Sequence, residues 1–185
     1  LAATAGTLQI GDAGSNSPGA SVSNAIGITI GSGATLDLPR NHALTVQTVA
    51  WSLPPIALNS GSKLQFRGTT GSNIHQVSAP ISVNGATTID NNGVSYGLDI
   101  TLSGLLSGTG SINYVASSAS GSATATRTLT VSNGSNTYIG NWSVNYSAST
   151  TDDFIALLPT ASGALGTGTV SLGSRAQLLG NTAGA

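Results

Sequence analysis

The carboxylates are the side chains in this sequence whose type and spacing come closest to a catalytic arrangement. All six acidic residues are aspartates, and only Asp152 and Asp153 are close in sequence. Glycosidases place two carboxylates about 5 to 9.5 Å apart, whereas adjacent residues on a strand point to opposite faces. We therefore interpret this pair as a solvated turn before a strand at 154–158. The remaining aspartates have turn-like contexts or outward strand positions, typical of Asx turns: Asp12, Asp37, Asp90 and Asp99.

The histidines and glycine-rich runs do not point to a reactive site. His42 and His75 are far apart, without other metal ligands at suitable spacing, and we expect both at the surface. Cysteine is absent, which excludes disulfides and thiolate chemistry. The Gly-x-Gly runs at 31–33 and 166–168 open no helix, so we interpret them as chain corners and not as phosphate loops. The sequence thus predicts no catalytic residue, cofactor or metal site.

Aromatic side chains are the better candidates for ligand binding. Tyr138, Trp142 and Tyr146 lie on one side of a segment with period two. If that side faces outward, they form a platform for a glycan; if it faces inward, they fill the core, which is the interpretation we favour. We expect Trp51, which precedes Ser-Leu-Pro-Pro, to hold a loop against the body of the protein.

The composition indicates a β-rich protein that does not bind nucleic acid and of which this segment does not insert into a membrane. Only 6% of the residues are charged, against roughly 25% in ordinary soluble domains. The formal net charge is -1 and the five basic residues are scattered, whereas nucleic-acid binding needs clustered Lys and Arg. No stretch approaches the roughly 18 apolar residues of a membrane helix. The chain starts at Leu1 and contains no Met, so we interpret residues 1–185 as one fragment of a longer repetitive protein.

The elements that must position these residues repeat along the chain. Residues 28–38 (ITIGSGATLDL) and 56–66 (IALNSGSKLQF) superimpose without a gap, and 170–178 (VSLGSRAQL) is a third copy. Looser copies lie at 81–89, 100–112 and 129–139. Each is a pair of alternating strands around a polar corner. Alternation predicts an inward set and an outward set: Ile28, Ile30, Leu36 and Leu38 inward, and Thr29, Thr35 and Asp37 outward.

This spacing predicts a right-handed parallel β-helix of roughly eight rungs. The copies begin at 28, 56, 81, 100, 129 and 170, about one rung apart, with a last gap wide enough for two. Unequal spacing disfavours a propeller or barrel, whereas a solenoid accommodates extra residues as loops. At about 4.8 Å per rung the rod would be about 40 Å long. We expect less regular rungs or loops within 39–127.

Two segments carry a family resemblance. Leu129 to Gly140 (LTVSNGSNTYIG), followed by Ser162 to Gly173 (SGALGTGTVSLG), resembles the autotransporter-associated β-strand repeat. Gly6–Gly11 and Gly33–Leu38 resemble the later half of another copy. The resemblance covers about half of the chain and departs from the pattern within 39–127 and at Asn141-Trp142, where a second Gly is usual. It implies a parallel β-helix in a secreted or surface-displayed bacterial protein, commonly an autotransporter passenger.

The expected function is therefore structural or adhesive display at the bacterial cell surface. The alternative is a self-assembling extracellular filament or sheath subunit, and a polysaccharide-active β-helix enzyme ranks third. The expected partners are surface glycans or copies of the chain itself.

Overall fold

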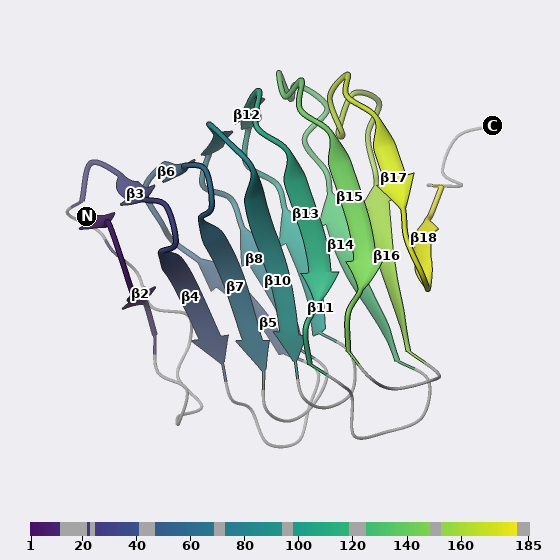
Figure 1. Ribbon diagram of the computed structural model, residues 1–185, viewed down its shortest axis with the longest axis horizontal. Helices are drawn as coiled ribbons and strands as arrows, with labels where there is room; N and C mark the ends of the chain where they lie inside the picture. Colours follow the sequence, from purple (N-terminus) through teal and green to yellow (C-terminus); the bar gives the residue numbers. More distant parts are fainter. Residues whose placement is uncertain are drawn as a thin grey trace.

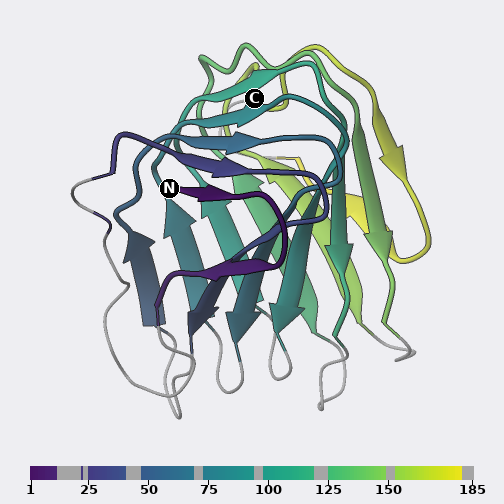
Figure 2. The same ribbon diagram turned by 60° about the vertical axis from the view of Figure 1, so that its left-hand side comes forward.

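The protein is an all-β solenoid, seen in a computed structural model that describes residues 1–11, 22, 25–40, 47–68, 73–93, 98–118, 125–148 and 153–180. Three parallel sheets surround a common interior (Figures 1 and 2). None of the described residues lies in a helix. Accordingly, no helix in this part of the chain is long and apolar enough to cross a membrane.

We name the three sheets A, B and C, with strands in spatial order along the solenoid axis. Sheet A contains β1 (Ala2–Ala3), β3 (Ile28–Ile30), β6 (Ile56–Leu58), β9 (Ile81–Val83) and β12 (Leu106–Gly108). Sheet B contains β2 (Thr7–Gln9), β4 (Thr35–Arg40), β7 (Lys63–Gly68), β10 (Thr87–Gly93), β13 (Ile112–Ala116), β15 (Trp142–Tyr146) and β17 (Val170–Leu172). Sheet C contains β5 (Gln47–Trp51), β8 (Asn73–Val77), β11 (Leu98–Leu102), β14 (Thr126–Val131), β16 (Phe154–Pro159) and β18 (Ala176–Leu178).

The gapless alignment of residues 28–38 with residues 56–66 matches the register in which their strands pair. Ile28 pairs with Ile56 in sheet A, and Leu36 pairs with Leu64 in sheet B. The 81–89 copy continues both ladders, since Ile81 pairs with Ile56. The sequence therefore predicted the stacking of these three turns correctly.

The later copies are displaced around the axis. Ile100 pairs with Leu129 in sheet C, not in sheet A. The 170–178 copy begins one sheet later than 28–38, because Val170 pairs with Trp142 in sheet B. Pairs of alternating strands around a polar corner occur both between sheets A and B, at residues 31–34, and between sheets B and C, at residues 173–175, so the local pattern identifies a corner without specifying which one.

The predicted count of eight rungs is not confirmed. In the described part of the chain, the smallest sheet has five strands and the largest has seven. One turn takes 21 to 30 residues: Ile155 pairs with Ala176, and Ile112 pairs with Trp142. Seven strands have six spacings, which at about 4.8 Å each give roughly 29 Å instead of 40 Å.

The core is a set of aliphatic columns that run along the axis. Ile28, Ile30, Leu36 and Leu38 are each at most 1% exposed, which confirms the predicted inward set. The outward set is only partly right. Thr29 is exposed, but Asp37 is 3% exposed because an arginine on the next strand covers it.

At the corner between sheets A and B, the later turns form a column of closely stacked glycines: Gly85, Gly110, Gly140 and Gly168. A Cβ on Gly140 would lie 1.9 Å from the carbonyl oxygen of Gly110, and a Cβ on Gly168 would lie 1.9 Å from that of Gly140. Gly33 and Gly166 turn the chain with φ of 73° and 75°. The Gly-x-Gly runs are therefore corners, as predicted.

Candidate functional site

The three aromatic candidates lie inside the solenoid. Tyr138, Trp142 and Tyr146 are 0%, 1% and 8% exposed, so they form no exposed platform for a glycan. The Tyr138 and Trp142 rings meet edge to face with centroids 5.6 Å apart, and the Trp142 indole N–H donates to the carbonyl oxygen of Leu165 at 3.1 Å. Burial raises the pKa of Tyr138 to about 12. Their inward direction matches the core-packing interpretation.

Arg127 is a buried cation that the sequence analysis did not anticipate. It occupies an inward position of β14 and is 0% exposed. Its guanidinium donates to the carbonyl oxygens of Gly93, at 2.8 Å, and Ser118. The Tyr146 ring lies 5.9 Å away, at cation–π distance. Arg127 alternates in phase with Leu129 and Val131, and this signal could have identified it as an inward residue.

Asp153 belongs to the same interior region. It is 1% exposed and accepts hydrogen bonds from the backbone N–H of Ala125 at 2.9 Å and from the Tyr146 hydroxyl at 2.8 Å. The prediction of a solvated turn is therefore wrong for Asp153, since the chain folds this carboxylate back against the previous turn. Asp152 lies outside the described residues.

A second group of polar side chains connects to Arg127 through Tyr114. The Asn91 amide donates to the carbonyl oxygen of Leu98 at 2.5 Å and lies 3.4 Å from the Tyr114 hydroxyl. That hydroxyl donates to the backbone carbonyl of Arg127 at 3.2 Å. Burial raises the pKa of Tyr114, so the phenol stays neutral at physiological pH. This network holds sheets B and C together across the interior.

His75 is fully buried, so the prediction of a surface histidine is wrong. The indole N–H of Trp51 donates to its Nδ1 at 3.1 Å, and the two rings stack with centroids 5.8 Å apart. Phe66 meets the imidazole edge to face at 5.4 Å. Trp51 is the last residue of β5 and is 2% exposed, so it is a core residue and not a loop anchor. His42 lies outside the described residues.

The outer face of sheet B has two ion pairs. The Arg67 side chain donates to both carboxylate oxygens of Asp37, with Nε distances of 2.8 and 2.9 Å, and this hydrogen bonding raises the pKa of Arg67. Lys63 lies 3.4 Å from Asp90. Both residues are within strands, which agrees with the outward strand position predicted for Asp37, whereas the turn predicted at Asp90 is wrong. Each is at most 3% exposed, so neither carboxylate is open to a substrate.

Asp99 is also a strand residue and not a turn residue. It lies in β11, and its carboxylate accepts a hydrogen bond from the backbone N–H of Thr128 at 3.0 Å. Burial raises its pKa above the ordinary range despite this hydrogen bond. Asp12 lies outside the described residues. In the described part of the chain, no three potential ligands gather into a metal site.

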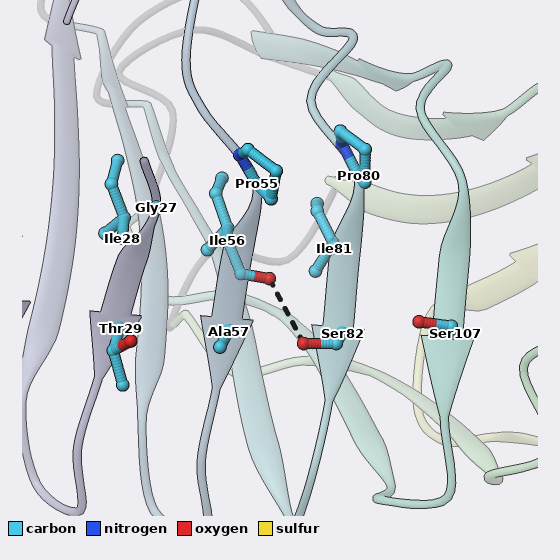
Figure 3. Close-up of a pocket in the computed structure, with 10 residues that line it drawn as sticks. All are labelled: Gly27, Ile28, Thr29, Pro55, Ile56, Ala57, Pro80, Ile81, Ser82 and Ser107. Carbon is cyan, nitrogen blue, oxygen red and sulfur yellow. Dashed lines mark hydrogen bonds between the residues drawn. The ribbon is translucent and has the colours of Figure 1, made fainter. Parts of the chain in front are cut away.

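The outer face of sheet A has a different character from these polar regions. A shallow groove of about 260 Å³ crosses it, shown in Figure 3. Small side chains form its floor in one row across neighbouring strands: Thr29, Ala57, Ser82 and Ser107. Pro55 and Pro80, which immediately precede β6 and β9, form one side. No charged side chain lines the groove.

The groove is the described feature best placed to contact another molecule. The buried networks are inaccessible, and the carboxylates of the sheet B ion pairs are at most 3% exposed. In comparisons with known proteins, no family model, curated protein or solved structure matches the chain.

Proposed function

We propose that this chain is a structural and adhesive segment of a secreted, surface-displayed bacterial β-helix of the autotransporter passenger type, with a right-handed coil. In this role the rod holds an interaction surface away from the cell. Its conformation is maintained by the stacked core and requires no cofactor. The proposal assigns no catalytic residue to the chain.

The observation that carries this proposal is the way in which the two repeat-like segments stack. Asn136, from the Asn-Thr-Tyr-x-Gly motif, accepts from the backbone N–H of Leu106 at 2.7 Å and donates to the carbonyl oxygen of Ala164 at 2.6 Å. Its amide thus bridges three successive turns. Ala164 belongs to the second motif, Gly-Ala-Leu-Gly, so the two motifs are in direct contact.

The other motif residues have equally specific positions. The buried Tyr138 hydroxyl donates to the carbonyl oxygen of Gly110 at 2.7 Å. Gly166 passes so close to Tyr138 that a Cβ would lie 1.8 Å from its carbonyl oxygen. A repeat whose Asn, Tyr and Gly residues connect adjacent turns can be extended into a long rod, which supports a role as a spacer at the cell surface.

Surface display can be tested on the cells that produce the protein. Antibodies against the purified chain should label intact cells, and external protease should remove the signal while a cytoplasmic marker survives. Labelling that appears only after the cells are permeabilised would contradict the proposal. Adhesion is tested separately, by comparing the attachment of chain-coated and albumin-coated beads to target cells.

One observation favours the alternative of a self-assembling filament. Leu172 and Leu178 are each 47% exposed, although they continue the inward columns of Val144 and Leu157. Such exposed core positions favour axial stacking of another turn. If the chain assembles end to end, Leu172→Lys with Leu178→Lys should abolish concentration-dependent filaments in electron micrographs. A wild-type chain that stays monomeric at millimolar concentration would exclude this alternative.

A further inference from the structure

The charged side chains of the solenoid are unevenly distributed among its three faces. Those within strands belong to sheets B and C: Asp37, Arg40, Lys63, Arg67 and Asp90 in sheet B, and Asp99 and Arg127 in sheet C. None of the described residues of sheet A is charged. An ionic partner that binds this face would lose its hydration. Because the face has no charge, no electrostatic attraction would compensate for that loss. The partner of sheet A is therefore expected to be neutral.

The floor of the groove is a row of small side chains at the spacing of the strands. Ser82 pairs with Ala57 on one side and with Ser107 on the other, so successive positions are about 4.8 Å apart. The Ser82 hydroxyl donates only a long bond, at 3.5 Å, to the carbonyl oxygen of Ile56. Its lone pairs remain available as acceptors. The row thus presents hydroxyls along the axis at Thr29, Ser82 and Ser107, with the methyl group of Ala57 between the first two.

An apolar ridge runs beside this row. The carbonyl oxygens of Pro55, Pro80 and Leu105 accept from the first residues of the neighbouring strands, at 2.8 Å in each case, so these three residues are stacked. Leu105 is 39% exposed, and Ile26, which precedes Gly27 of the groove, is fully exposed. Pyranose rings have both apolar C–H faces and hydroxyl edges. A hydroxyl row next to an aliphatic ridge complements both.

The size of the face argues against a second copy of the chain as the partner. Five strands of up to three residues cover about 19 Å by 10 Å. That is roughly 200 Å², a quarter of the 800 Å² per partner in a typical stable protein interface. A narrow polymer lying along the axis needs no such area at one site, because contacts repeated on successive turns add up through multivalency.

We propose that the outer face of sheet A binds a neutral polysaccharide chain, which lies along the solenoid axis between the hydroxyl row and the Pro55–Pro80–Leu105 ridge. This inference rests on the proposed adhesive role and names its partner class. It locates recognition on small hydroxyl and proline side chains, whereas the sequence pointed to aromatic rings. Without an aromatic platform, each contact is weak, so binding depends on the length of the polymer.

The test is depletion of the purified chain from solution by insoluble cellulose, chitin, xylan and mannan, with carboxymethyl cellulose beads as the anionic comparison. At least one neutral polymer should deplete the wild-type chain, and the anionic beads should not. Ser82→Lys places a long charged side chain in the middle of the groove and should weaken binding at least tenfold. Ser171→Lys is the matched control, because Ser171 is an exposed outward residue of sheet B.

Three results would overturn the inference. They are depletion by no neutral polymer, equal binding by Ser82→Lys and wild type, and a concentration-dependent dimer in analytical ultracentrifugation that Ser82→Lys abolishes. Circular dichroism and the melting temperature verify that both variants fold. Failure here leaves surface labelling and bead attachment unaffected, so it is distinguishable from failure of the proposed function.

Discussion

The glycine column between sheets A and B provides the sharpest prediction, Gly140→Ala. The new Cβ would lie 1.9 Å from the carbonyl oxygen of Gly110 and 2.6 Å from the Tyr138 hydroxyl, whereas real Cβ contacts essentially never fall below 3.0 Å. The two turns would therefore have to separate by at least 3.0 - 1.9 = 1.1 Å. Because both contacts involve buried atoms within the stack, no flexible side chain can absorb this shift.

The expected loss in the free energy of unfolding of Gly140→Ala follows from a hydrogen bond next to this close contact. The backbone N–H of Ile112 donates to the carbonyl oxygen of Asn141 at 2.9 Å, and a shift of 1.1 Å along this bond lengthens it to about 4.0 Å, beyond hydrogen-bond range. A lost buried bond costs about 1 to 3 kcal/mol, and overpacking costs about 1 to 3 kcal/mol. We expect a loss of about 2 to 6 kcal/mol in the free energy of unfolding. For a chain of this size that is about 4 to 24 °C in melting temperature.

Two matched glycine variants isolate the clash from other effects of an added methyl group. Gly33→Ala has φ of 73° and nothing within 4 Å of the new Cβ, so it reports only the left-handed backbone, at about 1 to 2 kcal/mol. Gly180→Ala also has nothing within 4 Å and lacks a positive φ. It should leave the melting temperature unchanged or slightly raised. The measurement is thermal and urea unfolding followed by far-ultraviolet circular dichroism.

The ranking of the three unfolding temperatures tests whether the backbones at Gly140 and Gly110 are in close approach. If Gly140→Ala unfolds at the same temperature as Gly33→Ala, the backbones are not in close approach and the stacking of the two repeat motifs is wrong. If Gly180→Ala is as damaging as Gly140→Ala, the loss does not come from the column.

Three further predictions concern buried ionisable groups. Tyr146→Phe removes the hydroxyl that donates to Asp153 and should lower the free energy of unfolding by about 1.5 to 3 kcal/mol; an unchanged urea midpoint would refute the bond. Asp99→Asn keeps an oxygen to accept the Thr128 N–H but removes a carboxylate whose pKa is raised by burial. The variant should therefore raise the melting temperature near pH 7. It should have less effect at about pH 3, because there the carboxylate is largely protonated in both the folded and the unfolded state. An equal effect at both pH values would contradict this cause. Tyr138 has a pKa of about 12 when folded and about 10 when unfolded, so the folded chain binds more protons in between and stability should fall as pH rises above about 10. Tyr138→Phe should flatten this alkaline loss, which urea midpoints across the range can measure.

Much of the local structure could be predicted because it depends on side-chain alternation. Ile28, Ile30, Leu36 and Leu38 repeat with period two around a glycine corner, and an identical spacing recurs 28 residues later. Both features are local, so the inward set and the stacking of the turns that begin at residues 28 and 56 followed directly from them. Count and position of the later turns were not predictable in the same way, since Val170 and Ile28 begin similar patterns at different corners.

The polar residues were harder to interpret because their environment depends on the turns above and below them. His75, Arg127 and Asp153 are hydrophilic by type, and each is buried only because partners 7 to 34 residues away, or more distant still, surround it. Arg127 had the parity of a core residue, but parity alone does not distinguish an inward cation from a break in the repeat. The carbonyl oxygens that accept its hydrogen bonds become neighbours only when sheets B and C close.

The sequence by itself determined that this chain is a stack of short parallel strands with an aliphatic interior, because side-chain alternation and corner glycines act between residues close in the chain. The tertiary structure decided which faces are accessible. It turned the aromatic candidates inward, paired or buried the strand aspartates, and left sheet A as an uncharged face with a row of hydroxyls. The physical reason is that exposure is set by neighbours on adjacent turns, 21 to 30 residues away in the sequence, whose register is fixed only when the solenoid closes.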